Sequence, residues 1–243
     1  TLINPTKVGY NFIGWTGSNG DSPSLTVTIE KGSTGDREYI ANFEPKEYVI
    51  ESTNIHVESP EMIVKYGENK VGNYVKPERQ YIVGFNENSQ GATISSLDDL
   101  TVKYEFDGFY INTTTKLIDS EGNLMPNVEG YTDSEGRWIG DFTSSTLVDD
   151  VYKGDVVYPE LAPVVTLPQV EKDGYSCKWN SRSDGTGYSY DSSEVISGLS
   201  RSMTLYAVCN PNTYTITLDN QYATTPGSTS VTVTYGSSAL SIT

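Results

Sequence analysis

The sequence repeats itself, and this constrains its fold more than any other feature. The segment Pro5–Trp15 has a counterpart in Pro168–Trp179, and both place a Gly-Tyr step after a proline and shortly before a tryptophan. A looser third copy, Lys103–Tyr110, puts Phe109 in the place of the tryptophan. Self-similarity of this kind is typical of a small supersecondary unit that is repeated along the chain. The sequence therefore predicts several small modules rather than one large domain.

The modules are predicted to consist mainly of β-strands. The segments Arg37–Phe43 and Ser202–Cys209 alternate apolar and polar residues, which is typical of half-buried strands. Valine-rich stretches that end in a Tyr-Gly step recur at Ile63–Gly67 and Val231–Gly236. The chain contains 18 tyrosines, and aromatic and β-branched residues favour strands over helices.

The order of these elements resembles a known family. An alternating strand, a Tyr-Gly step, a proline, the Gly-Tyr-to-Trp segment, a glycine-rich turn and a Leu-Tyr-Ala strand follow one another as in the Listeria–Bacteroides repeat, also called the internalin B-repeat. The stretch Leu205–Cys209, followed by Thr213–Asp219, is similar to a junction between two such repeats. The resemblance covers 1–45 and 166–243 and is weak in 46–165. It implies a mainly β (α+β) chain of tandem, small β-grasp-like repeat modules, with at most one short helix each, as found on bacterial surface and secreted proteins.

The same alignment predicts the module boundaries. Residues 1–45 are the C-terminal half of a module, 46–165 are a divergent β-rich region of one or two modules, 166–212 are a module with a cysteine pair, and 213–243 are the N-terminal half of a further module. A half-module leaves a strand edge open. We therefore expect head-to-tail self-association, or complementation of the last half-module by Thr1–Phe43.

Cys177 and Cys209 take the places that Phe12 and Phe43 occupy in the first copy. Two aromatic positions of one module have thus become two thiols together, which predicts that they touch and form a structural disulfide. Such a bond would stabilise the module by about 3–4 kcal/mol in the chain-entropy model. The alternative is a pair of buried, reduced thiols that act as small hydrophobic groups. An extracellular setting favours the disulfide.

The central region contains the same four residues twice, at Asp119–Gly122 and Asp133–Gly136, and both are predicted to be hairpin turns. Trp138 follows the second turn and has no counterpart in the other copies. Together with Tyr131 and Phe142 it has two interpretations. The three rings form either part of the core or an exposed platform for a sugar ring.

The acidic balance of the chain restricts its partners. The net charge is −16, which repels nucleic acid and anionic membrane surfaces and keeps a protein soluble at high local concentration. No apolar run is long enough to span a bilayer. We expect neither a nucleic-acid partner nor a membrane span.

The residue types needed for catalysis are scarce. His56 is the only histidine, and it lies in an alternating stretch that predicts an exposed strand position. No nucleophile motif accompanies it, and one histidine with two distant cysteines does not make a zinc site. No catalytic, cofactor-binding or metal-binding residues are therefore expected. Asp149, Asp150 and Asp155 are interpreted as surface turn residues, with a weak Ca²⁺ site at a module junction as the alternative.

These features predict a protein that is not an enzyme. The expected function is that of a non-catalytic extracellular repeat region, which acts as a stalk, spacer or adhesive part of a bacterial cell-surface or secreted protein. Its expected partners are other repeats of the same protein. The alternative is a module that binds a glycan or a host protein and is centred on residues 46–165.

Overall fold

The computed structural model describes residues 3–53, 61–155 and 159–241. These residues are mainly β, as predicted, and their only helical segments are the short 3-10 turns Asn112–Thr114 and Pro159–Leu161. In this part of the chain no helix follows either Tyr-Gly step. The described residues also contain no helix that is both long and apolar enough to cross a membrane. His56 lies outside the described residues.

The chain forms two compact units, and each unit is built from two separate segments. Unit 1 contains 1–78 and 105–158, and unit 2 contains 79–104 and 159–243. The predicted central region 46–165 therefore does not form one piece, because its residues 79–104 belong to unit 2. The physical reason is that this region holds the first strands of two different sheets.

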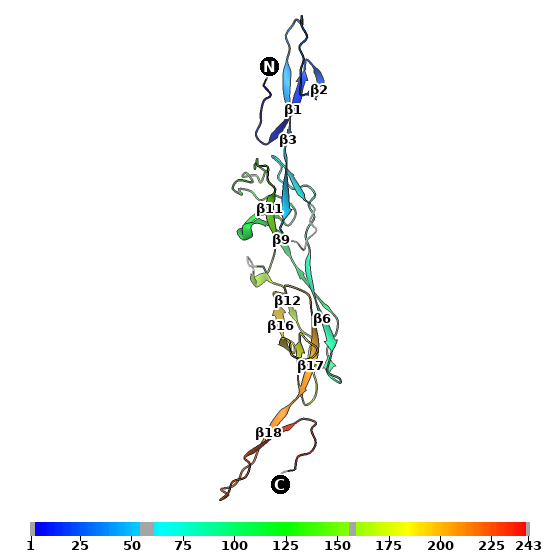
Figure 1. The fold of residues 1–243 in the computed structure, drawn as a ribbon, viewed down its shortest axis with the longest axis vertical. Coiled ribbons are helices and arrows are strands. Elements are labelled where there is room, and N and C mark those ends of the chain that lie inside the picture. The colour runs from blue at the N-terminus through cyan, green and yellow to red at the C-terminus, as the bar shows by residue number, and fades with distance from the viewer. Residues whose placement is uncertain (1–2, 54–60, 156–158, 242–243) are drawn as a thin grey trace. The chain divides into compact units, whose positions relative to one another are not determined.

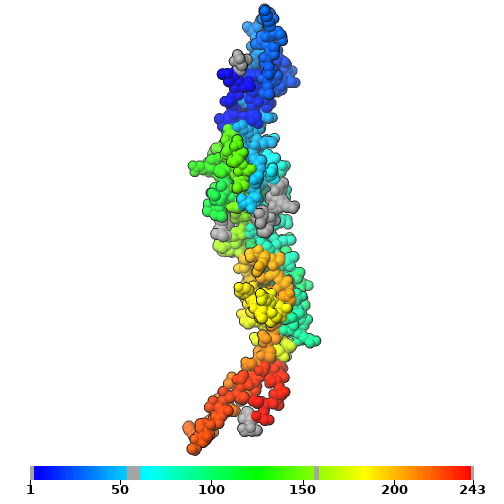
Figure 2. All heavy atoms as spheres, viewed as in Figure 1, coloured from blue at the N-terminus to red at the C-terminus, as the bar shows by residue number. Residues whose placement is uncertain are grey.

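The main sheet of unit 1 has five strands in the order β10-β9-β11-β4-β5. Its strands β9 and β11 are labelled in Figure 1. Strand β11 runs parallel to β4, and the other neighbours are antiparallel. Figure 2 shows the green residues of the later segment lying against the cyan residues of the earlier one. The strands are β4 (Glu47–Ser52), β5 (Met62–Lys65), β9 (Phe106–Ile111), β10 (Thr115–Asp119) and β11 (Thr146–Tyr152).

The main sheet of unit 2 has the same arrangement, with the order β15-β14-β17-β6-β8. In both sheets the first and the last strand in chain order are parallel neighbours, here β6 and β17. The strands are β6 (Arg79–Glu87), β8 (Leu100–Tyr104), β14 (Tyr175–Asn180), β15 (Ser189–Asp191) and β17 (Met203–Pro211). Two short antiparallel pairs complete the unit, β12 (Val164–Thr166) with β16 (Val195–Ser197) and β7 (Thr93–Ile94) with β13 (Val170–Glu171).

Each unit also carries a partial sheet. In unit 1 this is the three-stranded sheet β2-β1-β3, and in unit 2 it is the pair β18-β19. Strand β3 leads into β4 and strand β17 leads into β18 across a single residue. The strands are β1 (Tyr10–Gly17), β2 (Gly20–Ser24), β3 (Tyr39–Pro45), β18 (Thr213–Thr217) and β19 (Ser230–Thr234).

Alternation along the strands produces the two cores. In β4 every second residue points inward, so Tyr48 and Ile50 are buried while their neighbours are more exposed. Trp138 is fully buried in unit 1, and Trp179 is fully buried in unit 2 against Phe85, with ring centroids 4.9 Å apart. Large aromatic side chains of this kind contribute most to the stability of small cores.

The two identical four-residue segments of the central region form matching turns, as predicted. The carboxylates of Asp119 and Asp133 each accept backbone N–H groups from the residues two and four positions further on, at 2.8–2.9 Å. Gly122 and Gly136 end the turns at φ values of 85° and 72°, which favour glycine. Antiparallel bridges flank both turns.

Candidate functional site

Cys177 and Cys209 form a disulfide between neighbouring antiparallel strands. They lie directly opposite each other in the β14–β17 pair, with their Cα atoms 4.0 Å apart. In the β1–β3 pair the same place is taken by Phe12 and Phe43, whose ring centroids are 5.7 Å apart. The alignment of the two copies thus identified two residues that touch, and the structure contains no free cysteine, since both are in this bond.

The third, looser copy has an equivalent contact. Phe106 lies opposite Tyr152 in the β9–β11 pair, and their ring centroids are 5.4 Å apart. Phe109 is fully buried three residues further on, where Trp15 stands in the first copy. The C-terminal half of each module therefore carries one cross-strand pair at this place. The pair is either two aromatic rings or the disulfide.

A glycine and a β-bulge precede the ring at the tryptophan place in two of the copies, where Trp15 is half-buried and Phe109 is fully buried. The strand register shifts next to Gly14 in β1 and next to Gly108 in β9. A Cβ atom on Gly108 would lie 2.4 Å from the carbonyl oxygen of Ile118, and Gly108 has a φ of 154°. Only glycine fits at such a close approach, and in β9 the bulge turns the ring of Phe109 into the core.

The place where one module leads into the next has a specific geometry in unit 1. The backbone N–H of Lys46 donates to the carbonyl of Gly9 at 2.9 Å, and the N–H of Tyr66 donates to the carbonyl of Lys46 at 3.0 Å. The ring of Tyr66 covers Gly9 so closely that a Cβ there would lie 2.0 Å from the ring. Tyr10 packs edge-on against Tyr66 at 5.5 Å. We call these residues the first junction.

Unit 2 contains the same set of contacts, which we call the second junction. The N–H of Asn212 donates to the carbonyl of Gly174 at 2.9 Å, and the N–H of Tyr235 donates to the carbonyl of Asn212 at 2.8 Å. A Cβ on Gly174 would lie 2.4 Å from the ring of Tyr235, and Tyr175 packs edge-on against this ring at 5.7 Å. The Gly-Tyr step and the Tyr-Gly step of the repeat thus contact each other across a single linking residue.

A lysine lies over the Gly-Tyr tyrosine at both junctions. The Nζ of Lys7 is 3.7 Å from the ring centroid of Tyr10, and the Nζ of Lys172 is 4.2 Å from that of Tyr175. A cation over an aromatic face is attracted to it by about 0.5–1 kcal/mol at an exposed site. Each lysine therefore adds a cation–π attraction to the Gly-Tyr tyrosine of its junction.

Among the residues that the structure describes, only the first junction has a carboxylate hydrogen-bonded to it. Asp141 accepts hydrogen bonds from the ammonium of Lys46 at 2.7 Å and the hydroxyl of Tyr48 at 2.8 Å, with a longer contact of 3.4 Å to the N–H of Gly9. The hydrogen bonds from Lys46 and then Tyr48 lower the pKa of Asp141 below its usual value. Burial, together with Asp141, raises the pKa of Tyr48.

This difference predicts that acid loosens the first junction before the second. Because the pKa of Asp141 is lowered by folding, its stabilising contribution is complete above the ordinary carboxyl pKa of about 3.9 and is lost as the pH falls through the lowered value. We expect hydrogen-exchange protection of the Lys46 and Tyr66 amides to fall as the pH drops below about 4. Protection of Asn212 and Tyr235 should change much less.

The variant Asp141→Asn is the control for this measurement. It retains the shape of the side chain and removes the titration, so the protection of Lys46 and Tyr66 should start lower and no longer depend on pH in this range. Equal acid sensitivity of the two junctions in the unmodified protein would contradict the assignment to Asp141.

The three rings considered as a sugar platform do come together, but Trp138 itself is buried in the core, with Tyr131 and Phe142 half-buried against it. Trp138 is fully buried, and its indole N–H donates to the carbonyl of Gly140 at 2.9 Å. Tyr131 and Phe142 pack against it with ring centroids 5.7 and 5.8 Å away. A sugar ring needs an exposed aromatic face, and Trp138 does not offer one.

The aspartates considered for a weak Ca²⁺ site are used within the fold. Asp149 accepts a hydrogen bond from the hydroxyl of Thr53, and Asp155 accepts one from the N–H of Tyr152 at 2.9 Å. Asp150 is buried. Over the residues that the structure describes, no group of three or more Asp, Glu, His or Cys side chains is placed to hold a metal ion.

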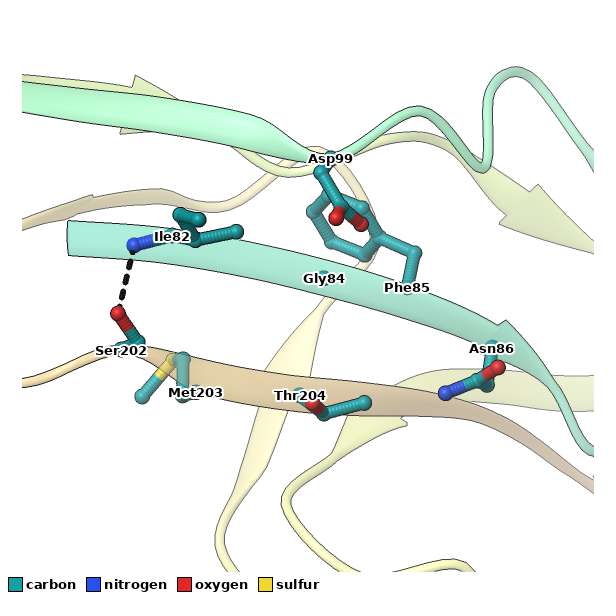
Figure 3. A pocket seen from close by; sticks show the side chains of 8 residues that line it. All are labelled: Ile82, Gly84, Phe85, Asn86, Asp99, Ser202, Met203 and Thr204. Atoms are coloured by element: carbon teal, nitrogen blue, oxygen red, sulfur yellow. Dashed lines mark hydrogen bonds between the residues drawn. The ribbon is translucent and has the colours of Figure 1, made fainter.

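An open hollow of about 460 Å³ lies on the sheet of unit 2 between β6 and β17 (Figure 3). Gly84 lines it without a side chain; a Cβ there would lie 3.1 Å from the carboxylate of Asp99. At one end the N–H of Ile82 donates to the hydroxyl of Ser202 at 2.9 Å. Asp99 is the only ionisable side chain among the residues that line the hollow, so they supply no acid–base pair.

Comparisons with family models, with curated proteins and with solved structures found no match to this chain. The feature of the molecule that bears most directly on function is the junction, because the same set of contacts is built twice.

Proposed function

We propose that the chain is a non-catalytic extracellular spacer, made of tandem β-grasp-like modules, within a bacterial cell-surface or secreted protein. The resemblance to the Listeria–Bacteroides repeat supports this proposal. So does the strand order of both five-stranded sheets, in which the first and last strands run parallel side by side. The disulfide is compatible with an oxidising, extracellular setting.

The observation that carries the proposal is that the same junction is built twice. Lys46 and Asn212 each link one sheet to the next, and each is held by backbone hydrogen bonds on both sides. Pro45 and Pro211 precede them and fix the backbone φ angle at the end of the previous strand. A linker of one residue that is tied on both sides cannot act as a free hinge. A repeated, stiff junction holds successive modules at a set separation, which is what a spacer requires.

The alternative of a glycan-binding centre has lost its support from the sequence. It depended on an exposed ring of Trp138, and this ring is buried. The net charge of −16 fits a spacer, because like charges keep neighbouring copies on a crowded surface apart.

Stiffness at the first junction can be measured directly. Cysteines introduced at Ser22 and Ser134, which are exposed on the two sides of this junction, accept spin labels while the native disulfide stays closed. We expect pulsed electron–electron double resonance to give one narrow distribution of distances between the two spin labels. The substitution Gly9→Ala should broaden it, because the added Cβ collides with the Tyr66 ring at a φ of 75°.

The matched control is Gly174→Ala in the same labelled protein. It creates the equivalent collision in the second junction, so it should leave the distances between positions 22 and 134 unchanged. A broad distribution in the unmodified junction would overturn the spacer proposal, because modules joined by a hinge do not keep a fixed separation.

A further inference from the structure

One loop of unit 2 is much longer than its counterparts in the other copies. The strand with the tryptophan place is followed by residues 18–19 in the first copy and by 112–114 in the third, whereas 181–188 separate β14 from β15. The strands on both sides pair in the same way in all three copies. In repeat proteins an insertion of this kind often forms part of a binding face. The insertion 181–188, which we call the long loop, is therefore a candidate for a binding function.

A buried asparagine holds the long loop in one shape. Asn180 is 2% exposed, and its side-chain amide donates to the carbonyls of Gly185 and Gly187, both at 3.1 Å. Its side-chain oxygen accepts the backbone N–H groups of Arg182 and Gly187 at 2.9 and 3.0 Å. A polar side chain that is buried and satisfied in this way fixes the backbone around it. The side chains of the loop are thus positioned before a ligand arrives, which lowers the entropy cost of binding.

The long loop borders an open hollow of about 590 Å³, a volume typical of small-molecule sites. The hollow is lined by residues of the long loop, by Tyr190 of β15 and by 201–204 at the start of β17. It shares Ser202, Met203 and Thr204 with the smaller hollow of Figure 3, so the two adjoin. All the residues that line either hollow belong to unit 2.

Two arginines from separate parts of the sequence meet at the larger hollow. Arg182 belongs to the long loop, and Arg201 precedes β17. In the part of the chain that the structure describes, neither guanidinium has an ion pair or a hydrogen bond, whereas Arg137 is paired with acidic side chains. The carboxylate of Asp184 accepts hydrogen bonds from the N–H and the hydroxyl of Thr186 instead. A free guanidinium binds a carboxylate through two parallel N–H bonds, so the pair favours an acidic ligand.

Two tyrosines supply flat apolar faces beside the arginines. Tyr188 is 82% exposed, and Tyr190 is half-buried. Tyr188 is fixed in place because its N–H donates to the hydroxyl of Ser181 and its carbonyl accepts the N–H of Ser181, both at 2.9 Å. Ser202 and Thr204 add hydroxyl groups. An apolar ring face next to hydroxyl groups suits a sugar ring, which has C–H groups on its face and hydroxyl groups at its edge.

We propose that this hollow binds a sugar residue that carries one carboxylate. Arg182 and Arg201 hold the carboxylate, and Tyr188 packs on the sugar ring. The net charge of −16 opposes a polyanion, so a single acid group among neutral sugars fits best. Asp99, in the adjoining hollow, repels a second acid group and can accept hydrogen bonds from the hydroxyls of a neutral sugar (Figure 3). The arginines and tyrosines lie outside residues 46–165, and the site does not depend on the spacer role.

Chemical-shift titration of the isotope-labelled whole chain tests the proposal, at about 0.15 M salt, which screens charges more than about 8 Å away. The probes are short oligosaccharides that each carry one glucuronate, galacturonate or sialate residue. Their methyl esters are the control ligands, because they keep the shape and lose the charge. We expect an acidic probe to bind with a Kd of about 1 mM or tighter and to shift the amides of the long loop and of 201–204. Its methyl ester should bind about tenfold more weakly.

Four variants locate the site. Arg182→Gln and Arg201→Gln should each weaken binding of the acidic probe by about tenfold, because each removes charge-assisted hydrogen bonds. Tyr188→Ala removes a ring face and keeps both charges, so it should weaken binding by about threefold. Lys103→Gln is the matched control. It removes one positive charge from an exposed position in β8 of the same unit, outside the lining of the hollow, and should leave the Kd unchanged.

Three results would overturn the proposal. The first is that none of the acidic probes binds. The second is that an acidic probe and its methyl ester bind equally well, or that Lys103→Gln weakens binding as much as the arginine variants do. The third is that a short glutamate peptide binds as tightly as the best sugar and is not affected by Tyr188→Ala, which would make the hollow a site for acidic peptides.

Discussion

Reduction of the Cys177–Cys209 disulfide is expected to lower the free energy of unfolding of unit 2 by about 3–4 kcal/mol. The bond closes a loop with a sequence separation of 32, and in the chain-entropy model opening it increases the freedom of the unfolded chain. Urea-dependent hydrogen exchange, followed by mass spectrometry with and without reductant, measures this for each segment. Loss of protection should be confined to strands of unit 2, such as β14 and β17.

The double variants Cys177→Ser/Cys209→Ser and Cys177→Phe/Cys209→Phe separate the bond from the packing. The serine pair removes both and should destabilise unit 2 by at least as much as reduction, which is about 3–4 kcal/mol. The phenylalanine pair recreates the cross-strand contact seen between Phe12 and Phe43, so it should recover part of the loss. Identical protection of the oxidised and reduced proteins would show that the disulfide does not stabilise the module.

Trp138→Ala is expected to destabilise unit 1 by about 3–5 kcal/mol, because it removes a fully buried aromatic side chain and leaves a cavity. The neighbouring rings of Tyr48, Tyr131 and Phe142 each lose a packing partner. Exchange protection of β4, β9 and β11 reports the loss, and that of unit 2 serves as the internal reference.

The control for this prediction is Ile139→Ala at the next position. Ile139 is 41% exposed, and an exposed substitution of this kind changes stability by about 0.5 kcal/mol or less. A folded, equally stable Trp138→Ala protein that had lost the ability to bind a glycan would reinstate the platform interpretation.

The sequence contained enough information for the cysteine pair and for the strand-rich fold. Both follow from comparing copies of one short pattern, in which the same residue types recur in the same order with a difference of one residue in spacing. The third copy was also recognisable, and Phe109 does lie where the copies have tryptophan. The burial of Trp138 was harder to predict, because no other copy has a residue at an equivalent place.

The junctions and the division into two interleaved units could not be predicted in this way. Gly9 contacts Tyr66 only because the five strands that lie between them in the chain, β1 to β5, bring them together. Strands β4, β6 and β18 share a tyrosine and a branched apolar residue two positions later, so their local patterns are alike. Which of them pairs with β11 and which with β17 depends on contacts far apart in the sequence, and periodicity does not encode those.

The interleaving has a consequence for synthesis. When β11 emerges from the ribosome, β4 and β6 have both been made and neither has its parallel partner, because β17 comes later still. The similar strands β4 and β6 then compete to pair with β11. A mistaken pair of β11 with β6 would have to separate before either unit could form. Non-local parallel pairing is slow to form in any case. Newly made chains are therefore most vulnerable to aggregation and to chaperone capture in the interval between the appearance of β11 and that of β17.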